Sequence, residues 1–168
     1  MALTTPVFVA IEYIRAMMDL VTLLGSVGAV RKLLSSVSAT LYKAIQDMKP
    51  VDKTVEALFR EIASLQGSID AIDSALRQPP TQAIIRDDED CDLWRSVNGC
   101  LLECRRTVER LKKLMGDREN KPSLNPFRKA MKQNEVDWKS AEVVTLPQQI
   151  HSHSLAMQLA LQAINVYV

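Results

Sequence analysis

Two cysteines and two histidines are the residues of this chain whose types and spacing could do chemistry. Cys100 and Cys104 stand four residues apart, and His151 and His153 follow on a later segment. Residues four apart share one face of a helix, so these four side chains could bind zinc between two helices, or a Cys/His pair could act in nucleophilic catalysis. No CxxC or similarly specific spacing accompanies them, and Cys104 and His153 fall at core positions of helical patterns. We therefore expect packing roles for them, with no metal, no cofactor and no enzymatic activity.

Other catalytic signatures are missing from the sequence. It contains no glycine-rich phosphate loop, no G-x-S-x-G, no H-E-x-x-H and no dinucleotide fingerprint. The formal net charge is +1, and the basic residues are not interleaved with exposed aromatic ones, so we expect no nucleic-acid partner and no small-molecule substrate.

Basic residues nevertheless outnumber acidic ones between residues 105 and 139. The candidates for contact with an anionic membrane or an acidic partner are Arg105, Arg106, Arg110, Lys112, Lys113, Arg128, Lys129 and Lys132. The alternative is an ordinary solvated surface that offsets the acidic stretch before residue 92.

The composition favours helices as the elements that position these residues. Hydrophobic residues make up 47% of the 168 residues, aromatic residues only 5%, and the chain has just 5 glycines, which leaves little material for strands and hairpins. This length suits one hydrophobic core. The sequence predicts an all-α fold with residues 1–168 in a single domain.

Apolar residues recur at three- and four-residue spacing along five segments. The pattern predicts helices over 7–24, 30–48, 52–77 and 91–115, and a last one from Thr145 with Pro147 in its first turn. Gly25 and Gly28 should loosen or break the chain between the first two, and Gly116 should end the fourth. Pro79 and Pro80 should end the third helix and begin a loop that lasts to Asp90. With a short basic helix over 127–133, the result is an antiparallel helical bundle of four to five long helices plus a short basic one.

The first helix is apolar nearly all round, as helices buried by their own bundle or by a partner are. Its candidate face for self-association or membrane contact consists of Val7, Phe8, Ile11, Ile14, Met18 and Val21. The alternative is that this face belongs to the core. Three charged residues, Glu12, Arg15 and Asp19, argue against a resting transmembrane span, because each costs about 2.5–3.5 kcal/mol at a bilayer centre.

The three cysteines are odd in number and clustered, which indicates a reducing compartment rather than a secreted disulfide framework. Residues 1–30 lack a basic n-region and a small-residue cleavage site, so we expect no signal peptide. The expected localisation is cytoplasmic, with recruitment to a membrane on activation as a variant of the same prediction.

Three stretches resemble the fungal N-terminal domain that precedes NACHT or related nucleotide-binding modules and ankyrin repeats, in the HeLo-like group of STAND proteins. They are MDLVTLLGSVGAVRKLLSSVSATLYKAI (18–45), VEALFREIASL (55–65), and the segment 125–165 with NPFRK and QQIHSHSLAMQLALQAIN. The family usually begins near Met17 or Met18. Residues 1–16 are thus either an N-terminal extension or the result of an upstream start site, and the chain, which ends within a helical pattern, is expected to be the N-terminal part of a larger protein.

The resemblance implies a non-enzymatic signalling or adaptor module that passes on a signal when a downstream sensor oligomerises. Its partners would be other proteins or further copies of itself. Some relatives of this type disrupt membranes and cause cell death, so a membrane-active effector is the alternative function. A small metal-binding or enzymatic helical protein is a third hypothesis.

Overall fold

The computed structural model describes residues 5–47, 50–87, 92–116 and 138–167, with side chains between residues 20 and 166 of these ranges. Within them every regular element is a helix, and no strand occurs. The helices are α1 (Thr5–Asp47), α2 (Lys53–Leu76), α3 (Pro79–Asp87), α4 (Asp92–Leu114) and α6 (Ala141–Tyr167). The predicted all-α fold is confirmed.

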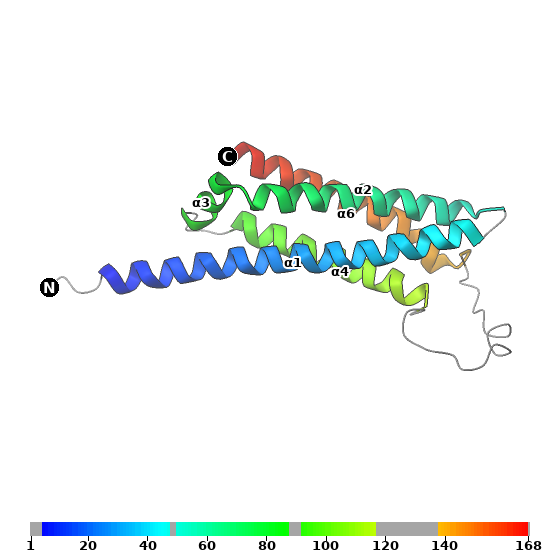
Figure 1. The fold of residues 1–168 in the computed structure, drawn as a ribbon, viewed down its shortest axis with the longest axis horizontal. Coiled ribbons are helices and arrows are strands. Elements are labelled where there is room, and N and C mark those ends of the chain that lie inside the picture. The colour runs from blue at the N-terminus through cyan, green and yellow to red at the C-terminus, as the bar shows by residue number, and fades with distance from the viewer. Residues whose placement is uncertain (1–4, 48–49, 88–91, 117–137, 168) are drawn as a thin grey trace.

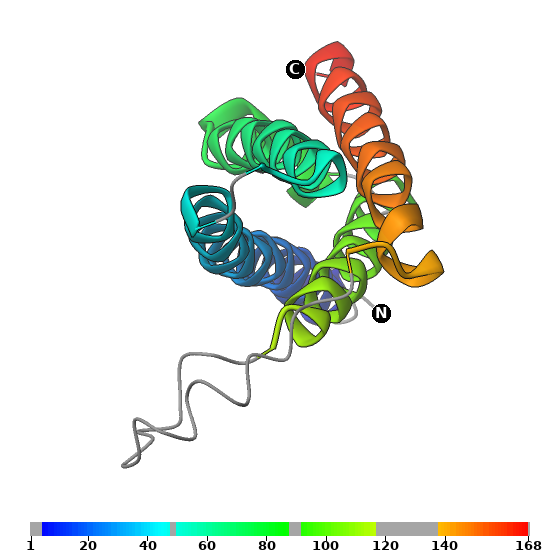
Figure 2. The same cartoon turned by 90° about the vertical axis from the view of Figure 1, so that its right-hand side faces the viewer.

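The four long helices form a bundle in which each packs against two of the others (Figure 2). α1 contacts α2 and α4, and α6 contacts the same two helices. Consecutive long helices run in opposite directions, as predicted, so that α1 is parallel to α4 and α2 is parallel to α6 (Figure 1). α2 and α4 lie diagonally across the bundle and are joined at one end through α3.

The core lies where one apolar stripe from each long helix meets the others. Fully buried residues of α2 recur in the predicted alternation, at Val55, Leu58, Ile62, Leu65, Ile69, Ile72 and Leu76. Burying one such side chain is worth about 1.5–3 kcal/mol, so this stripe dominates the stability of α2. At its start, the Asp52 carboxylate accepts a hydrogen bond from the Thr54 N–H at 2.7 Å and caps the helix.

The predicted break in the first helical segment is wrong, because α1 continues through both of its glycines. Gly25 and Gly28 are exposed, and a glycine inside a helix costs only about 1 kcal/mol relative to alanine. Leu23, Val27 and Val30, which surround them, are at most 2% exposed in the core. Their burial outweighs the cost of the glycines, so two predicted helices form one of 43 residues.

The predicted loop after Pro79 is wrong as well, since residues 79–87 form α3. A proline fits the first turn of a helix, where its missing N–H would have no intrahelical acceptor. Thr81 is 1% exposed and Ile85 is fully buried, and α3 packs against α1, α2 and α6. A helix at this point covers one end of the bundle core, which an irregular loop would cover less well (Figure 1).

The last helix begins at Ala141, before the predicted start, and Pro147 lies inside it. Ser140 caps its start, because its carbonyl accepts from the Val144 N–H at 3.0 Å and its hydroxyl from the Val143 N–H at 3.4 Å. Val143 and Leu146 are both buried, which fixes the early start. The predicted fourth helix and its stop at Gly116 (φ 78°) are confirmed, whereas the predicted short helix over 127–133 lies outside the described residues.

Candidate functional site

The N-terminal part of α1 extends beyond the ends of α2, α4 and α6 (Figure 1). Five of the six candidate contact residues belong to the first turns of α1: Val7, Phe8, Ile11, Ile14 and Met18. Their side chains lie outside the described ones, and only the helical backbone is described there. The sixth, Val21, is described and is 65% exposed.

The direction of this face follows from the continuity of α1. On one helix, positions 7, 11, 14, 18 and 21 fall on one side. The core stripe of the same helix begins at Leu23 and continues through Val27 and Val30, and it falls on the opposite side. Two neighbours show the contrast, since Val21 is 65% exposed and Leu23 is 2% exposed. By helical register, positions 7, 11, 14, 18 and 21 are therefore set away from the core stripe, whereas position 8, about 100° further round the helix than position 7, does not lie on that side.

One segment of α1, Leu20–Asp47, is long and apolar enough to cross a membrane by length and composition, and its most apolar window of 18 residues has a mean hydropathy of 1.4. Its most apolar stripe is in the core, at Leu23, Val27, Val30, Leu34, Val37 and Leu41, each at most 2% exposed. Packing in the bundle accounts for part of this hydropathy, because 28% of the apolar window is buried. The segment is therefore weak evidence for membrane association.

The predicted basic surface is spread around α4, and its arginines have acidic partners. Arg105 Nε lies 2.7 Å from Glu109 Oε1, and Arg106 forms an ion pair with Glu103. Arg110 Nε lies 2.6 Å from the carboxylate of Glu142 on α6. These carboxylates offset much of the positive charge that an anionic surface would meet.

Of the other basic candidates, Lys113 is exposed and Lys112 is partly buried. Arg128, Lys129 and Lys132 lie outside the described residues. In the described part of the predicted surface, which is five of its eight residues, the three arginines are all paired with carboxylates.

The structure separates the cysteines and histidines that could have formed a zinc site. His151 Nδ1 lies 3.0 Å from Glu61 Oε2 on α2, while His153 Nε2 lies 2.8 Å from Thr107 Oγ1 on α4. Burial raises the pKa of the Cys104 thiol to about 12, and the neighbouring Cys100 acts in the same direction. A thiol with this pKa is a poor nucleophile and metal ligand at neutral pH. Among the described residues, no three of the His, Cys, Asp and Glu side chains lie so that they could hold a metal ion.

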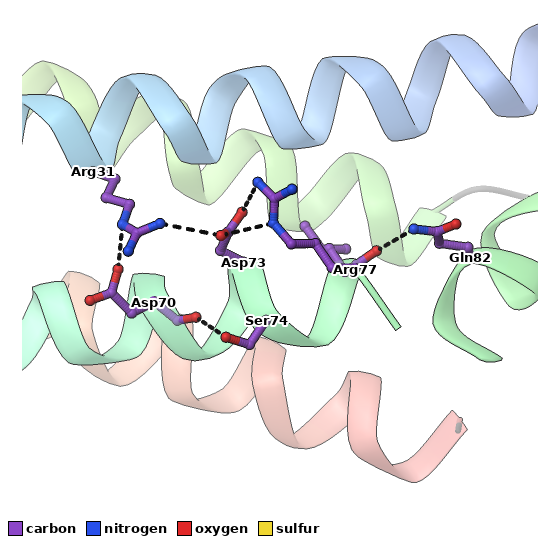
Figure 3. Close-up of polar contacts among 7 residues, drawn as sticks. Arg31, Asp70, Asp73, Ser74, Arg77 and Gln82 are labelled. Carbon is purple, nitrogen blue, oxygen red and sulfur yellow. Dashed lines mark hydrogen bonds and ion pairs between the residues drawn. The ribbon is translucent and has the colours of Figure 1, made fainter. Parts of the chain in front are cut away.

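A cluster of charged residues lies between α1 and α2 and was not predicted from the sequence (Figure 3). Asp73 is 8% exposed and accepts hydrogen bonds from Arg77 Nε at 3.0 Å and from Arg31 Nη1 at 3.4 Å. Arg31 also forms an ion pair with Asp70, in which Nε lies 2.7 Å from Oδ1. The hydrogen bond and the charge of Asp73 raise the pKa of Arg77. The sequence signal was a carboxylate beside the buried stripe of α2, which needs a cationic partner.

Polar pairs also link the other helices of the bundle. Ser26 of α1 donates to Asn98 of α4 at 2.8 Å, and the hydroxyl oxygens of Ser64 on α2 and Ser154 on α6 lie 3.0 Å apart. With Thr107 and His153 between α4 and α6, every neighbouring pair of long helices has at least one polar contact. Such contacts form only when the helices are aligned lengthwise, so they favour one register of the bundle.

No protein-family model, curated protein or solved structure matches this chain.

A pH-dependent loss of stability is expected from His153. Burial lowers its pKa below the ordinary 6.5, partly offset by the charge of Glu103. The unfolded chain then takes up the proton first. The stability contributed by neutral His153 is present above about pH 6.5 and is lost as the pH falls through the lower folded pKa. Urea unfolding of the native chain and of the His153→Gln variant between about pH 7.5 and 5 measures this contribution. The native chain should lose more stability, and equal losses would contradict the prediction.

Proposed function

We propose that this bundle is a non-enzymatic signalling or adaptor module of the fungal STAND-type, HeLo-like kind. It would act in the cytoplasm by self-association or by docking to a partner protein through the free end of α1. The observation that carries the proposal is that the backbone of α1 extends past the bundle at its N-terminal end, and that Val21, the described member of the candidate face, is 65% exposed. The resemblance of segments 18–45, 55–65 and 125–165 supports the family assignment.

The mechanism we propose is a shift in population. A contact through one helical face of a few turns is weak on its own, so single copies stay apart at low concentration. When a downstream sensor gathers several copies, their effective concentration rises and the same contact becomes occupied. Signalling then needs no chemistry within the bundle, only a surface that is free before clustering.

The test is the molar mass of the purified domain, measured by light scattering over a concentration series. The Ile14→Arg/Met18→Arg variant places two charges on the candidate face. It should lower the molar mass measured at high protein concentration, because only contacts elsewhere on the bundle can then hold copies together. The control is Ser35→Arg, an exposed position further along α1, which should leave the mass unchanged. A native mass that both variants leave unchanged would contradict self-association through α1.

A membrane-active effector is the second candidate function, and the apolar segment Leu20–Asp47 together with the free end of α1 is the observation that favours it. In this alternative, the free end enters an anionic bilayer and recruits the protein to the membrane on activation. Dye release from vesicles of mixed phosphatidylcholine and phosphatidylserine separates the two functions. An interaction module releases no dye, whereas release that the Ile14→Arg/Met18→Arg variant abolishes would favour the membrane function.

A further inference from the structure

The outer side of α6 is free of charge, which distinguishes it from the other long helices. Between residues 143 and 167 there is no Asp, Glu, Lys or Arg. The exposed positions of α4, by contrast, include Glu103, Arg105 and Arg106. α6 contacts α2 and α4 on its inner side and stands at the edge of the bundle (Figure 2). Its outer side is therefore open and has apolar, hydroxyl, amide and imidazole side chains, with no Asp, Glu, Lys or Arg over nearly its whole length.

Exposed apolar residues on this outer side form a second stripe, opposite the core stripe of Leu146, Ile150 and Met157. The exposed fractions are 53% for Val144, 47% for Leu155, 66% for Leu159 and 84% for Val166. Successive positions of the stripe are separated by four or three residues, as on one face of a helix. Its seven positions are Val144, Gln148, His151, Leu155, Leu159, Gln162 and Val166.

The spacing of this stripe is symmetric about Leu155, and so are its residue types except at His151 and Leu159. Val144 and Val166 each lie eleven residues from it, and Gln148 and Gln162 each lie seven residues from it. Eleven residues are about three helical turns, or about 16 Å, so both valines return to the line of Leu155. The separations along the stripe read 4, 3, 4, 4, 3, 4 in either direction. A surface with this symmetry matches a copy of itself turned end for end.

We propose that the outer stripe of α6 binds a second copy of the same stripe, antiparallel and related by a two-fold axis at Leu155. Leu155 then meets Leu155 of the second copy, and Val144 meets Val166. Gln148 meets Gln162, and two side-chain amides can both donate and accept. Leu159 packs against the ring of His151 of the second copy. Within each copy, His151 Nδ1 lies 3.0 Å from Glu61 Oε2 on α2, and this contact orients the ring.

The absence of charge selects this occupant. Charged groups of a partner would lose their hydration against the outer stripe of α6, which offers no Asp, Glu, Lys or Arg to pair with them. Binding of a charged surface would therefore be unfavourable. Depletion of charge with retained apolar residues is also the composition of the centre of protein interfaces. A second copy of α6 has no Asp, Glu, Lys or Arg at any of the seven positions and an apolar residue at four of them. This inference rests on α6 alone and does not depend on the face of α1 proposed above.

The test uses the full chain and the position on the two-fold axis. The native protein should dimerise with concentration in sedimentation equilibrium. Leu155→Arg should raise the dissociation constant at least about thirtyfold, the effect of a central hot-spot residue, because two like charges then meet. Leu155→Glu should do the same. An equimolar mixture of the two variants should recover a dimer, because position 155 faces its own counterpart and the charges become opposite.

The control is Gln149→Arg, which adds the same charge at an exposed position of α6 outside the stripe and should leave the dimer unchanged. Thermal unfolding of each variant by circular dichroism verifies that it folds, as expected from the 47% exposure of Leu155. A native protein that stays monomeric, a dimer that resists Leu155→Arg, or a mixture that fails to recover the dimer would each overturn the proposal. The Ile14→Arg/Met18→Arg variant of α1 should keep this dimer, so the two proposals can fail separately.

Discussion

Replacing Leu34 by alanine is expected to lower the free energy of unfolding by about 2–5 kcal/mol. Leu34 is fully buried in the core stripe of α1, and truncation removes apolar contacts and leaves a cavity. Urea unfolding followed by circular dichroism measures the change, provided that the slope of the unfolding free energy against urea concentration is the same in both proteins.

The matched control for Leu34→Ala is Val21→Ala on the same helix. Val21 is 65% exposed, so this substitution should change the free energy of unfolding by no more than about 0.5 kcal/mol. The pair also tests the role of the apolar segment Leu20–Asp47. A small effect at Leu34 would mean that α1 does not supply the core, and its hydropathy would then need a membrane or a partner to explain it.

The Gly25→Ala/Gly28→Ala double variant is expected to raise the free energy of unfolding by about 1–2 kcal/mol. Both glycines lie inside the continuous helix α1, and an added Cβ would have no neighbour within 4 Å at either position. Alanine would remove the entropic cost of glycine in a helix, which is roughly 0.5–1 kcal/mol for each residue. Urea unfolding measures the gain.

The control with the opposite sign is Gly116→Ala. Gly116 has a positive φ of 78°, which costs a residue with a Cβ roughly 1–2 kcal/mol, so this variant should be less stable. A loss of stability in the Gly25→Ala/Gly28→Ala variant would show that α1 bends at its glycines in solution.

The elements that could be predicted from the sequence are those with one unbroken period. The stripe of α2 from Val55 to Leu76 and that of α4 from Trp94 to Met115 needed only the spacing of apolar residues. The errors arose at glycines and prolines, where a local preference opposed burial. Gly25 and Gly28 did not break α1, and Pro79 began a helix, because in each case buried neighbours favoured the helix.

The candidate surfaces depend on which face of each helix the bundle covers, and a single segment does not contain that information. The apolar pattern of α6 predicts one buried face, which the structure has at Leu146, Ile150 and Met157, but it does not predict the second, exposed apolar stripe. Likewise, the Asp73 cluster needs Arg31, which lies 42 residues away along the chain. The sequence predicts a packing role for His153, but only the structure pairs His153 with Thr107 and His151 with Glu61.

The parallel pairing of α2 with α6 has a consequence for the order of folding. α1 and α2 are joined by a few residues and can close as a local hairpin, whereas the contact between Ser64 and Ser154 closes a loop of 90 residues. Loop closure costs entropy that increases with length, so contacts between distant segments form late. We expect α6 to dock last and to open first, which hydrogen exchange along the chain would reveal as weaker protection in α6 than in α2. α6, the helix with two apolar sides, is then also the one most often released from its own bundle. Once released, it can pair with the bundle of a second copy.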